Sequence, residues 1–180
     1  MEGRPLSLRL FFGLPLPLDL RENLDQWRRN YPGIEGWSRS EGLHLTLAFL
    51  GQRSAGSLPG LEGIARAIAR RHGPFALSTM ALGSFSRSRT TRLLWLGLAP
   101  SPALGALAED LRGSLLAGGE TVDTRPFHPH VTLARFRQAL VLAAFTDPSV
   151  QDFTADCLTL FASRPQGCYT GLQSWHLQRV

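Results

Sequence analysis

Hydrophobic and polar positions change their period repeatedly along the 180-residue chain, and each change marks the end of a predicted element. Continuous or alternating apolar residues predict strands, and apolar residues three or four apart predict helices. Predicted strands cover residues 7–15, 43–50, 75–85, 91–98, 130–136, 153–162 and 172–177, with a short extended piece at 37–39. Predicted helices cover residues 16–30, 58–71, 138–145 and a segment from about Pro102 to Gly118.

The order of these elements occurs twice. The segment RLFFGLP at 9–15 resembles RLLWLGL at 92–98, and each precedes a proline-led helix, a His-x-Thr strand, a second helix and a further strand. The offset is 92 − 9 = 83 at the first strands and 130 − 44 = 86 at the histidines. We therefore predict one two-lobed domain over residues 1–180, built from two βαβαβ repeats at about 6–86 and 90–180 plus one extra strand.

Both His-x-Thr strands read His-apolar-Thr-Leu-Ala. Alternate side chains of a strand share a face, so His44 projects beside Thr46 and His130 beside Thr132. If the two repeats are related by a pseudo-twofold axis, the histidines face each other across a cleft. That arrangement suits in-line displacement at phosphorus, because one imidazole takes a proton while the other gives one near its ordinary pKa of about 6.5. The threonine hydroxyls then bind non-bridging phosphate oxygens and stabilise the growing charge.

A metal site is the sharpest rival interpretation, and a purely structural role for each motif is the plainest one. His128 and His130 share a face, and His44 could be a third ligand. However, Pro129 separates the first two, and neither motif contains an acidic residue. The upstream copy has Gly42 where a second histidine would stand. We therefore predict no metal and treat His128 as a bystander near the mouth of the site.

The positive charge of the chain makes a phosphate-bearing or nucleic-acid partner plausible. The formal net charge is +5, and all 19 basic residues are arginine. Arginine forks match phosphate oxygens and stack on bases, which favours a phosphate-bearing or nucleic-acid partner, although genome composition or solubility explains an arginine-only chain equally well. Arg87, Arg89 and Arg92 surround a predicted basic turn, and Arg135 ends the second motif. In an ideal strand Arg135 points away from His130, so it reaches the site only where the strand twists or ends.

Other classes of function find little support in the sequence. Cys157 and Cys168 lack ligand spacing, so neither a disulfide nor redox chemistry is expected. No apolar run reaches the roughly 18 residues of a membrane helix, and the first ten residues lack the apolar core of a signal peptide. We expect a soluble, cytoplasmic protein, monomeric by default. His72 and His176 have no evident partners and are interpreted as surface or loop residues.

The surroundings of both motifs resemble the two-histidine phosphoesterase superfamily, and in particular its RNA 2′,3′-cyclic phosphodiesterases, historically called 2′-5′ RNA ligases. The resemblance spans nearly the whole chain and is carried by four segments: LHLTLAFLG at 43–51, GSF at 83–85, LWLG at 94–97 and RPFHPHVTLAR at 125–135. It implies an α+β fold with two lobes of antiparallel sheet around a central groove and helices outside.

The same resemblance implies an enzyme without metal or cofactor that opens 2′,3′-cyclic phosphates on RNA ends or small nucleotides, leaving a 2′-phosphate. His44 would be the proton donor to the leaving 3′-oxygen and His130 the base that activates water. Thr46 and Thr132 would bind the phosphate, and Arg135 and Arg92 are possible substrate contacts. Two alternatives stay open: a reversible 2′-5′ RNA ligase, and an RNA-binding module that does not turn over.

Overall fold

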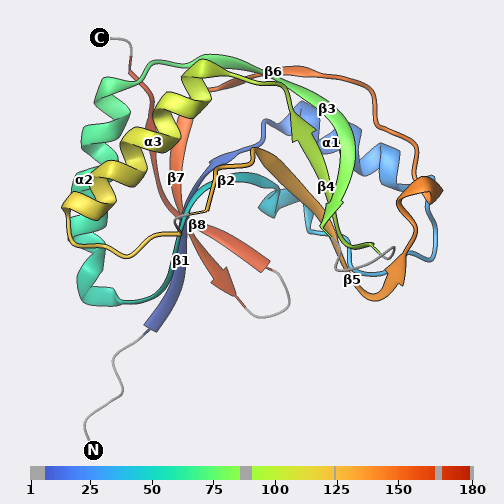
Figure 1. Ribbon diagram of the computed structural model, residues 1–180, viewed down its shortest axis with the longest axis horizontal. Coiled ribbons are helices and arrows are strands. Elements are labelled where there is room, and N and C mark those ends of the chain that lie inside the picture. Colours follow the sequence, from blue (N-terminus) through green and yellow to red (C-terminus); the bar gives the residue numbers. More distant parts are fainter. Residues whose placement is uncertain (1–6, 86–90, 124, 165–167, 179–180) are drawn as a thin grey trace, which may run out of the picture.

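The computed structural model describes residues 7–85, 91–123, 125–164 and 168–178 (Figure 1). Its strands are β1 Ser7–Pro15, β2 His44–Ser54, β3 Phe75–Phe85, β4 Thr91–Leu98, β5 His130–Leu140, β6 Asp152–Ala155, β7 Cys157–Arg164 and β8 Cys168–His176. Its α-helices are α1 Leu18–Arg28, α2 Leu58–Arg71 and α3 Pro102–Ala117. Single 3-10 turns lie at Ser40–Gly42, Ala55–Ser57 and Leu142–Ala144.

The strands form a sheet in the order β6-β3-β4-β5-β2-β1-β7-β8, and the paired neighbours run antiparallel. The sheet curls, with α2 and α3 packed together beside β1, β2 and β7, and α1 beside β4 and β5 (Figure 1). This arrangement confirms the α+β class, the antiparallel sheet and the outer position of the helices. In the part of the chain that the structure describes, no helix is long and apolar enough to cross a membrane.

The third strand of each sequence half pairs with the opposite half. β3 lies beside β4, whereas β7 lies beside β1, with Phe11 opposite Phe161. Each side of the sheet is therefore built from both halves of the sequence, and the segments 6–86 and 90–180 are not its two sides. The duplication itself remains a prediction, but its copies would be interlocked by exchanged strands.

Two predicted elements differ from the structure. The helix expected at 138–145 is wrong, because β5 continues to Leu140 and only a 3-10 turn follows. Buried Phe145 of this segment packs on Trp27 and Tyr31 at ring-centroid distances of 6.4 and 5.0 Å, so tertiary packing overrides local propensity. The strand expected at 153–162 is two strands, which break at Asp156 because β6 pairs with β3 and β7 with β1.

The core follows the apolar stripes of the helices and the inward face of the strands. Among the helices the buried set is largest in α3, whose apolar stripe is buried along its length: Leu104, Leu107, Leu111 and Leu115. The helix starts where Ser101 Oγ accepts a hydrogen bond from the Leu104 amide at 3.3 Å, as a preferred N-cap residue does. The helical periodicity of the sequence is thus sufficient to place these helices against the sheet.

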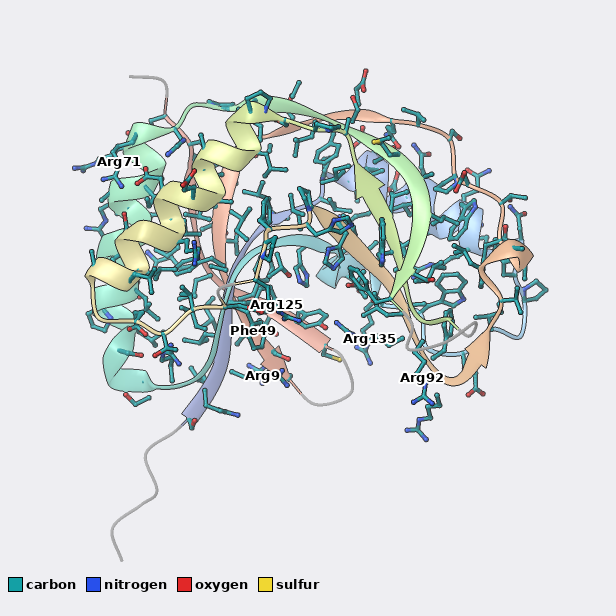
Figure 2. The ribbon with its side chains drawn as sticks, in the orientation of Figure 1. Arg9, Phe49, Arg71, Arg92, Arg125 and Arg135 are labelled. Atoms are coloured by element: carbon teal, nitrogen blue, oxygen red, sulfur yellow. The ribbon has the colours of Figure 1, made fainter. Side chains whose placement is uncertain are left out.

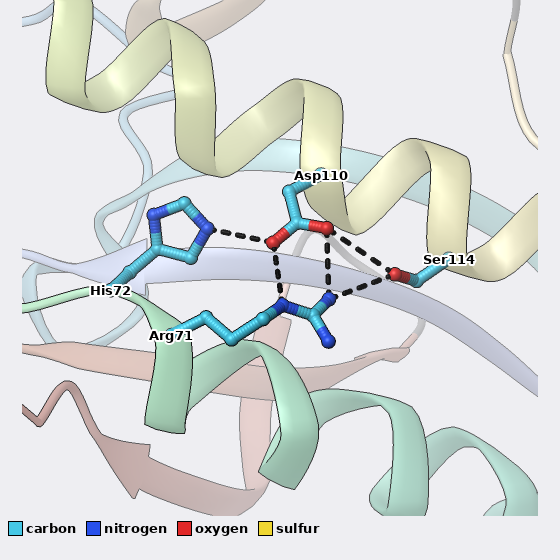
Figure 3. A network of polar contacts seen from close by, with 4 residues as sticks. All are labelled: Arg71, His72, Asp110 and Ser114. Carbon is cyan, nitrogen blue, oxygen red and sulfur yellow. Dashed lines mark hydrogen bonds and ion pairs between the residues drawn. The ribbon is translucent and has the colours of Figure 1, made fainter. Parts of the chain in front are cut away.

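Arg71 ends α2 at a distance from Arg9, Arg92 and Arg135 (Figure 2). Its Nε and Nη2 donate to the two oxygens of Asp110 on α3, at 3.0 and 2.8 Å. Asp110 also contacts His72 Nε2 at 2.8 Å, and Arg71 reaches Ser114 Oγ at 3.2 Å (Figure 3). The sequence context suggested that His72 has no partner, but the structure gives it Asp110 as one. The network joins the C-terminal end of α2 to α3.

Replacing Asp110 by Asn should lower the unfolding free energy by about 1 kcal/mol or less at neutral pH, because the groups are partly exposed. The Arg71 guanidinium lowers the pKa of Asp110 from its ordinary value of 3.8, and the His72 hydrogen bond acts in the same direction. A carboxyl with a lowered pKa stabilises the fold above its ordinary pKa, and this contribution is lost as pH falls through the lowered one.

Thermal melts should therefore show a gap of a few degrees between wild type and Asp110→Asn at pH 7 that shrinks below about pH 3.8. Glu109→Gln is the matched control, because Glu109 is exposed and forms no ion pair among the described residues. A gap that stays constant on acidification would show that the Asp110 charge is not the stabilising group.

Candidate active site

The two His-x-Thr pairs meet where β2 and β5 touch. The pairing residues are Leu45 and Val131, both buried at 1% and 0% exposure. Antiparallel register from this pair sets His44 across from Thr132 and Thr46 across from His130, all on the opposite sheet face. The bridge joins equivalent positions of the predicted repeats, because 131 − 45 = 86 matches the histidine offset. Two equivalent residues pair with each other in this way when a local twofold axis passes between them.

Both histidines are held in the same tautomer. His44 Nδ1 lies 2.6 Å from the carbonyl oxygen of Gly42, and His130 Nδ1 lies 2.7 Å from that of His128. A carbonyl oxygen only accepts, so each Nδ1 carries the hydrogen and donates it. Each Nε2 is thereby left for exchange of a proton with a ligand, which is the state that general acid–base catalysis requires.

Aromatic rings surround each imidazole. The His44 ring centroid lies 4.6 Å from that of Phe11, 5.1 Å from Phe161 and 4.7 Å from Tyr169. The His130 ring lies 5.2 Å from Phe85 on β3 and 5.9 Å from Trp95 on β4. Sequence reasoning missed Phe161 and Tyr169, because they are more than 100 residues from His44 and carry no motif. Phe85 and Trp95, in contrast, lie in two of the segments that carry the resemblance.

Burial sets the protonation of the pair. It lowers the pKa of His44 to about 4. The hydrogen bond to Gly42 raises this pKa, and the nearby charges of Arg135 and His130 lower it further. Burial also lowers the pKa of His130, and His128 and Arg135 act in the same direction. Both imidazoles are therefore neutral at pH 7 in the free protein. An anion bound between them favours the protonated forms and raises both pKa values.

A β-bulge turns Arg135 toward the histidines. Leu94 and Trp95 are consecutive on β4, but their partners on β5 are Ala134 and Thr132, so Leu133 is the extra residue. The bulge reverses the alternation after Thr132 and puts Arg135 on the face that carries the histidines. The parity of an ideal strand predicted the opposite.

Gly36 holds the bulged part of β5 in place. The Arg135 amide donates to the Gly36 carbonyl at 2.8 Å, and the Ser38 amide donates to that of Leu133 at 2.8 Å. Gly36 has a φ of 95°, and an added Cβ would lie 2.1 Å from the Arg135 carbonyl oxygen, so only glycine fits. The predicted extended piece at 37–39 is confirmed by the bridge between Trp37 and Ala134.

Of the other predicted arginines, the structure describes Arg92, which is not brought to the histidines. Arg92 is exposed, and its side chain points away from the body of the protein (Figure 2). Arg87 and Arg89 lie outside the residues that the structure describes. Arg135 is thus the predicted arginine whose charge acts on both imidazoles.

His128 lies beside His130. Its ring centroid is 6.0 Å from that of His130 and 5.0 Å from the indole of Trp95. Gly83 leaves room for this indole, because an added Cβ would lie 2.1 Å from it. Among the described residues, no group of three or more His, Cys, Asp and Glu side chains could hold a metal ion. His128 and His130 are therefore neighbours in a cluster of aromatic rings.

Known proteins match this chain in sequence and in fold. The family model of the 2′-5′ RNA ligase superfamily matches residues 16–163. The RNA 2′,3′-cyclic phosphodiesterase of Escherichia coli K12 is 36% identical over 176 residues, which cover 94% of this chain and 96% of that protein. Apo E. coli LigT superposes with a TM-score of 0.81 at 35% identity, covering 96% of this chain and 99% of that one.

A second E. coli LigT structure, complexed with 3′-AMP, has a TM-score of 0.80 at 35% identity and covers 97% of this chain and all of that one. The fold, the paired motifs and the relatives all indicate the same family, and the E. coli matches cover nearly the full length of the chain. The resemblance seen in the motif surroundings is confirmed: this chain is a member of the 2′-5′ RNA ligase superfamily.

Proposed function

We propose that the protein hydrolyses 2′,3′-cyclic phosphates at RNA ends to 2′-phosphomonoesters, without a metal, as a monomer in the cytoplasm. One observation carries the proposal: two histidines at equivalent positions both donate Nδ1–H to a carbonyl and keep Nε2 for a ligand. The names of the relatives support the substrate class, since the E. coli protein is an RNA 2′,3′-cyclic phosphodiesterase. The LigT complex with 3′-AMP supports a nucleotide as ligand.

The proposed reaction is an in-line displacement at phosphorus. His130 Nε2 takes a proton from water as the water oxygen bonds to phosphorus. The bond from phosphorus to O3′ breaks on the opposite side, and His44 Nε2–H protonates the leaving oxygen. Thr46 and Thr132 donate their hydroxyl hydrogens to the non-bridging oxygens, and Arg135 offsets their charge. Water is consumed, the phosphate stays on O2′, and one proton moves from His44 to His130 in net terms.

The decisive experiment is hydrolysis of 2′,3′-cyclic AMP followed by phosphorus NMR, with and without EDTA. A 2′-phosphate formed at the same rate in chelator is expected. A 3′-phosphate would mean that the other oxygen is displaced, and activity lost in EDTA and restored by zinc would overturn the metal-free mechanism.

No observation on the described residues favours ligation or binding alone. Binding without turnover does not require two imidazoles that both present Nε2. Ligation would use the same groups in reverse, with a 5′-hydroxyl oxygen in place of water. The geometry thus suits both directions of the reaction, and the name of the E. coli relative, a phosphodiesterase, favours hydrolysis.

The pH dependence of kcat/KM should reflect the lowered pKa values. The productive form needs one protonated and one neutral imidazole. Because both pKa values lie below about 6.5 in the free protein, this form becomes rarer by a factor of ten for each pH unit above that value. Initial rates at low substrate should therefore fall with a slope of about −1 in log kcat/KM between roughly pH 7 and 9. A flat profile there would show that neither histidine limits the reaction.

A further inference from the structure

The ring of Tyr169 on β8 lies against the His44 imidazole. The two ring centroids are 4.7 Å apart and the ring planes make an angle of 77°, which is the edge-to-face geometry that aromatic pairs prefer. Phe11 and Phe161 pack on the same imidazole with their planes closer to parallel, at 34° and 31°. The imidazole therefore sits in a corner made by rings from three strands, and Tyr169 supplies the perpendicular side of that corner.

Tyr169 also packs on Gly42, the residue that fixes the tautomer of His44. A Cβ added to Gly42 would lie 3.4 Å from Cδ2 and 3.5 Å from Cβ of Tyr169. The carbonyl oxygen of Gly42 accepts the Nδ1 hydrogen of His44 at 2.6 Å. Gly42 is buried and Tyr169 is half-buried, so this packing lies below the surface of the protein. Tyr169 thus contacts both partners of the hydrogen bond that leaves Nε2 for the substrate.

The second histidine is held less closely. Position 128 corresponds to Gly42, since 128 − 42 = 86, and it carries an exposed histidine whose ring centroid is 6.0 Å from that of His130. The ring nearest to His130 among the described residues is that of Phe85, at 5.2 Å. All three rings around His44 lie at 5.1 Å or less. The packing therefore restrains the His44 imidazole more tightly than that of His130.

We propose that Tyr169 is a positioning residue for the proton donor: its ring holds the His44 imidazole so that Nδ1–H stays on the Gly42 carbonyl and Nε2 faces the leaving oxygen. This inference rests on the proposed function. Rotation of the imidazole about its Cβ–Cγ bond would break that hydrogen bond and move Nε2, and the perpendicular ring opposes this rotation. Packing that locks a rotamer in this way keeps a catalytic group in its productive geometry. A misplacement of about 1 Å can cost roughly 100-fold in rate.

The test observes the imidazole directly, in long-range proton–nitrogen NMR spectra of the free protein labelled with ¹⁵N-histidine, at about pH 7. Wild type should show a protonated Nδ1 and an unprotonated Nε2 for both His44 and His130, because each Nδ1 donates to a carbonyl. Tyr169→Ala should bring the two nitrogen signals of His44 toward each other, as the ring exchanges between its tautomers. His130 should keep its signals and is the control within the same spectrum.

Three further variants identify what the ring contributes. Tyr169→Phe keeps the ring without the hydroxyl and should give the wild-type spectrum. Tyr169→Leu keeps much of the apolar bulk without the flat ring, and should change the His44 signals even if the alanine variant does not fold. Leu172→Ala removes a 40% exposed side chain from the same strand and should change nothing. Thermal melts verify that each variant is folded.

Kinetics on 2′,3′-cyclic AMP are compared at the pH optimum of each variant, because loss of the ring admits water to His44. Reduced burial should raise the pKa of His44 from about 4 toward 6.5, while the charges of Arg135 and His130 that also act on it stay in place. At its own optimum Tyr169→Ala should lose roughly 10- to 100-fold in kcat with KM nearly unchanged. Tyr169→Phe and Leu172→Ala should stay within about twofold of wild type.

The outcomes separate this inference from the proposed function. Wild-type His44 signals and wild-type kcat in Tyr169→Ala would overturn the positioning role. An equal loss in Tyr169→Phe would assign the effect to the hydroxyl, and equal changes at His44 and His130 would indicate general loosening of the sheet; either result would also overturn it. The spectra need no substrate. A wild-type protein that leaves 2′,3′-cyclic AMP intact would therefore overturn the function, while the His44 signals would still decide whether Tyr169 holds the ring.

Discussion

His44→Ala and His130→Ala are each expected to lower kcat/KM for 2′,3′-cyclic AMP by roughly 10²- to 10⁴-fold, the range of a lost general acid or base. In the proposed reaction each histidine carries the proton on its own side of the phosphorus, because its Nδ1 is bound to a backbone carbonyl and its Nε2 is left for the substrate. The fold should survive, because both histidine side chains lie on the sheet face opposite to the one that carries the buried side chains of Leu45 and Val131.

The double variant provides the sharper measurement. Groups that act as one unit are not additive, so His44→Ala/His130→Ala should be little slower than the slower single variant. His176→Ala, which removes an exposed histidine from β8, is the control and should stay within about twofold of wild type. If either single variant keeps more than a tenth of wild-type activity, that histidine is not a proton carrier.

Thr46→Val and Thr132→Val are expected to lower kcat by roughly 10- to 1,000-fold each, the cost of a lost oxyanion donor. Valine keeps the branched shape and removes only the hydroxyl, so packing in the strand is preserved. The effect should fall on kcat with KM nearly unchanged, because the phosphate oxygens gain charge in the transition state.

Serine substitution at the same positions is the matched control for the threonine variants. It restores the hydroxyl and should recover most of kcat. A valine variant that raises KM with kcat unchanged would instead assign the threonine to ground-state binding. Steady-state kinetics on 2′,3′-cyclic AMP measure both parameters in one experiment.

Strand periodicity was sufficient to predict the pairs His44 with Thr46 and His130 with Thr132, because alternation is a local property. The position of Arg135 could not be predicted in this way. An inserted residue at Leu133 reverses the alternation, and its cause is tertiary: residues 36–38 take over pairing with β5 where β2 leaves it. No pattern within 130–136 records that partner.

The rings around His44 were unpredictable for a related reason. Phe161 and Tyr169 come from β7 and β8, and β7 was expected as part of one longer strand. The repeat predicted equivalent elements in both halves, but it contained no information on which half each third strand would join. Exchange of β3 and β7 depends on sheet pairing, which a linear pattern does not encode.

That exchange governs when the protein can become active during its own synthesis. β1 is made first, yet its partner β7 follows about 150 residues later, as the pairing of Phe11 with Phe161 shows. Contacts between such distant segments form slowly and leave early strands with an open edge. A nascent chain that has reached residue 150 already contains both His-x-Thr motifs but neither Phe161 nor Tyr169 beside His44. The surroundings of His44 are therefore completed by synthesis of β7 and β8, and not by the appearance of the second motif.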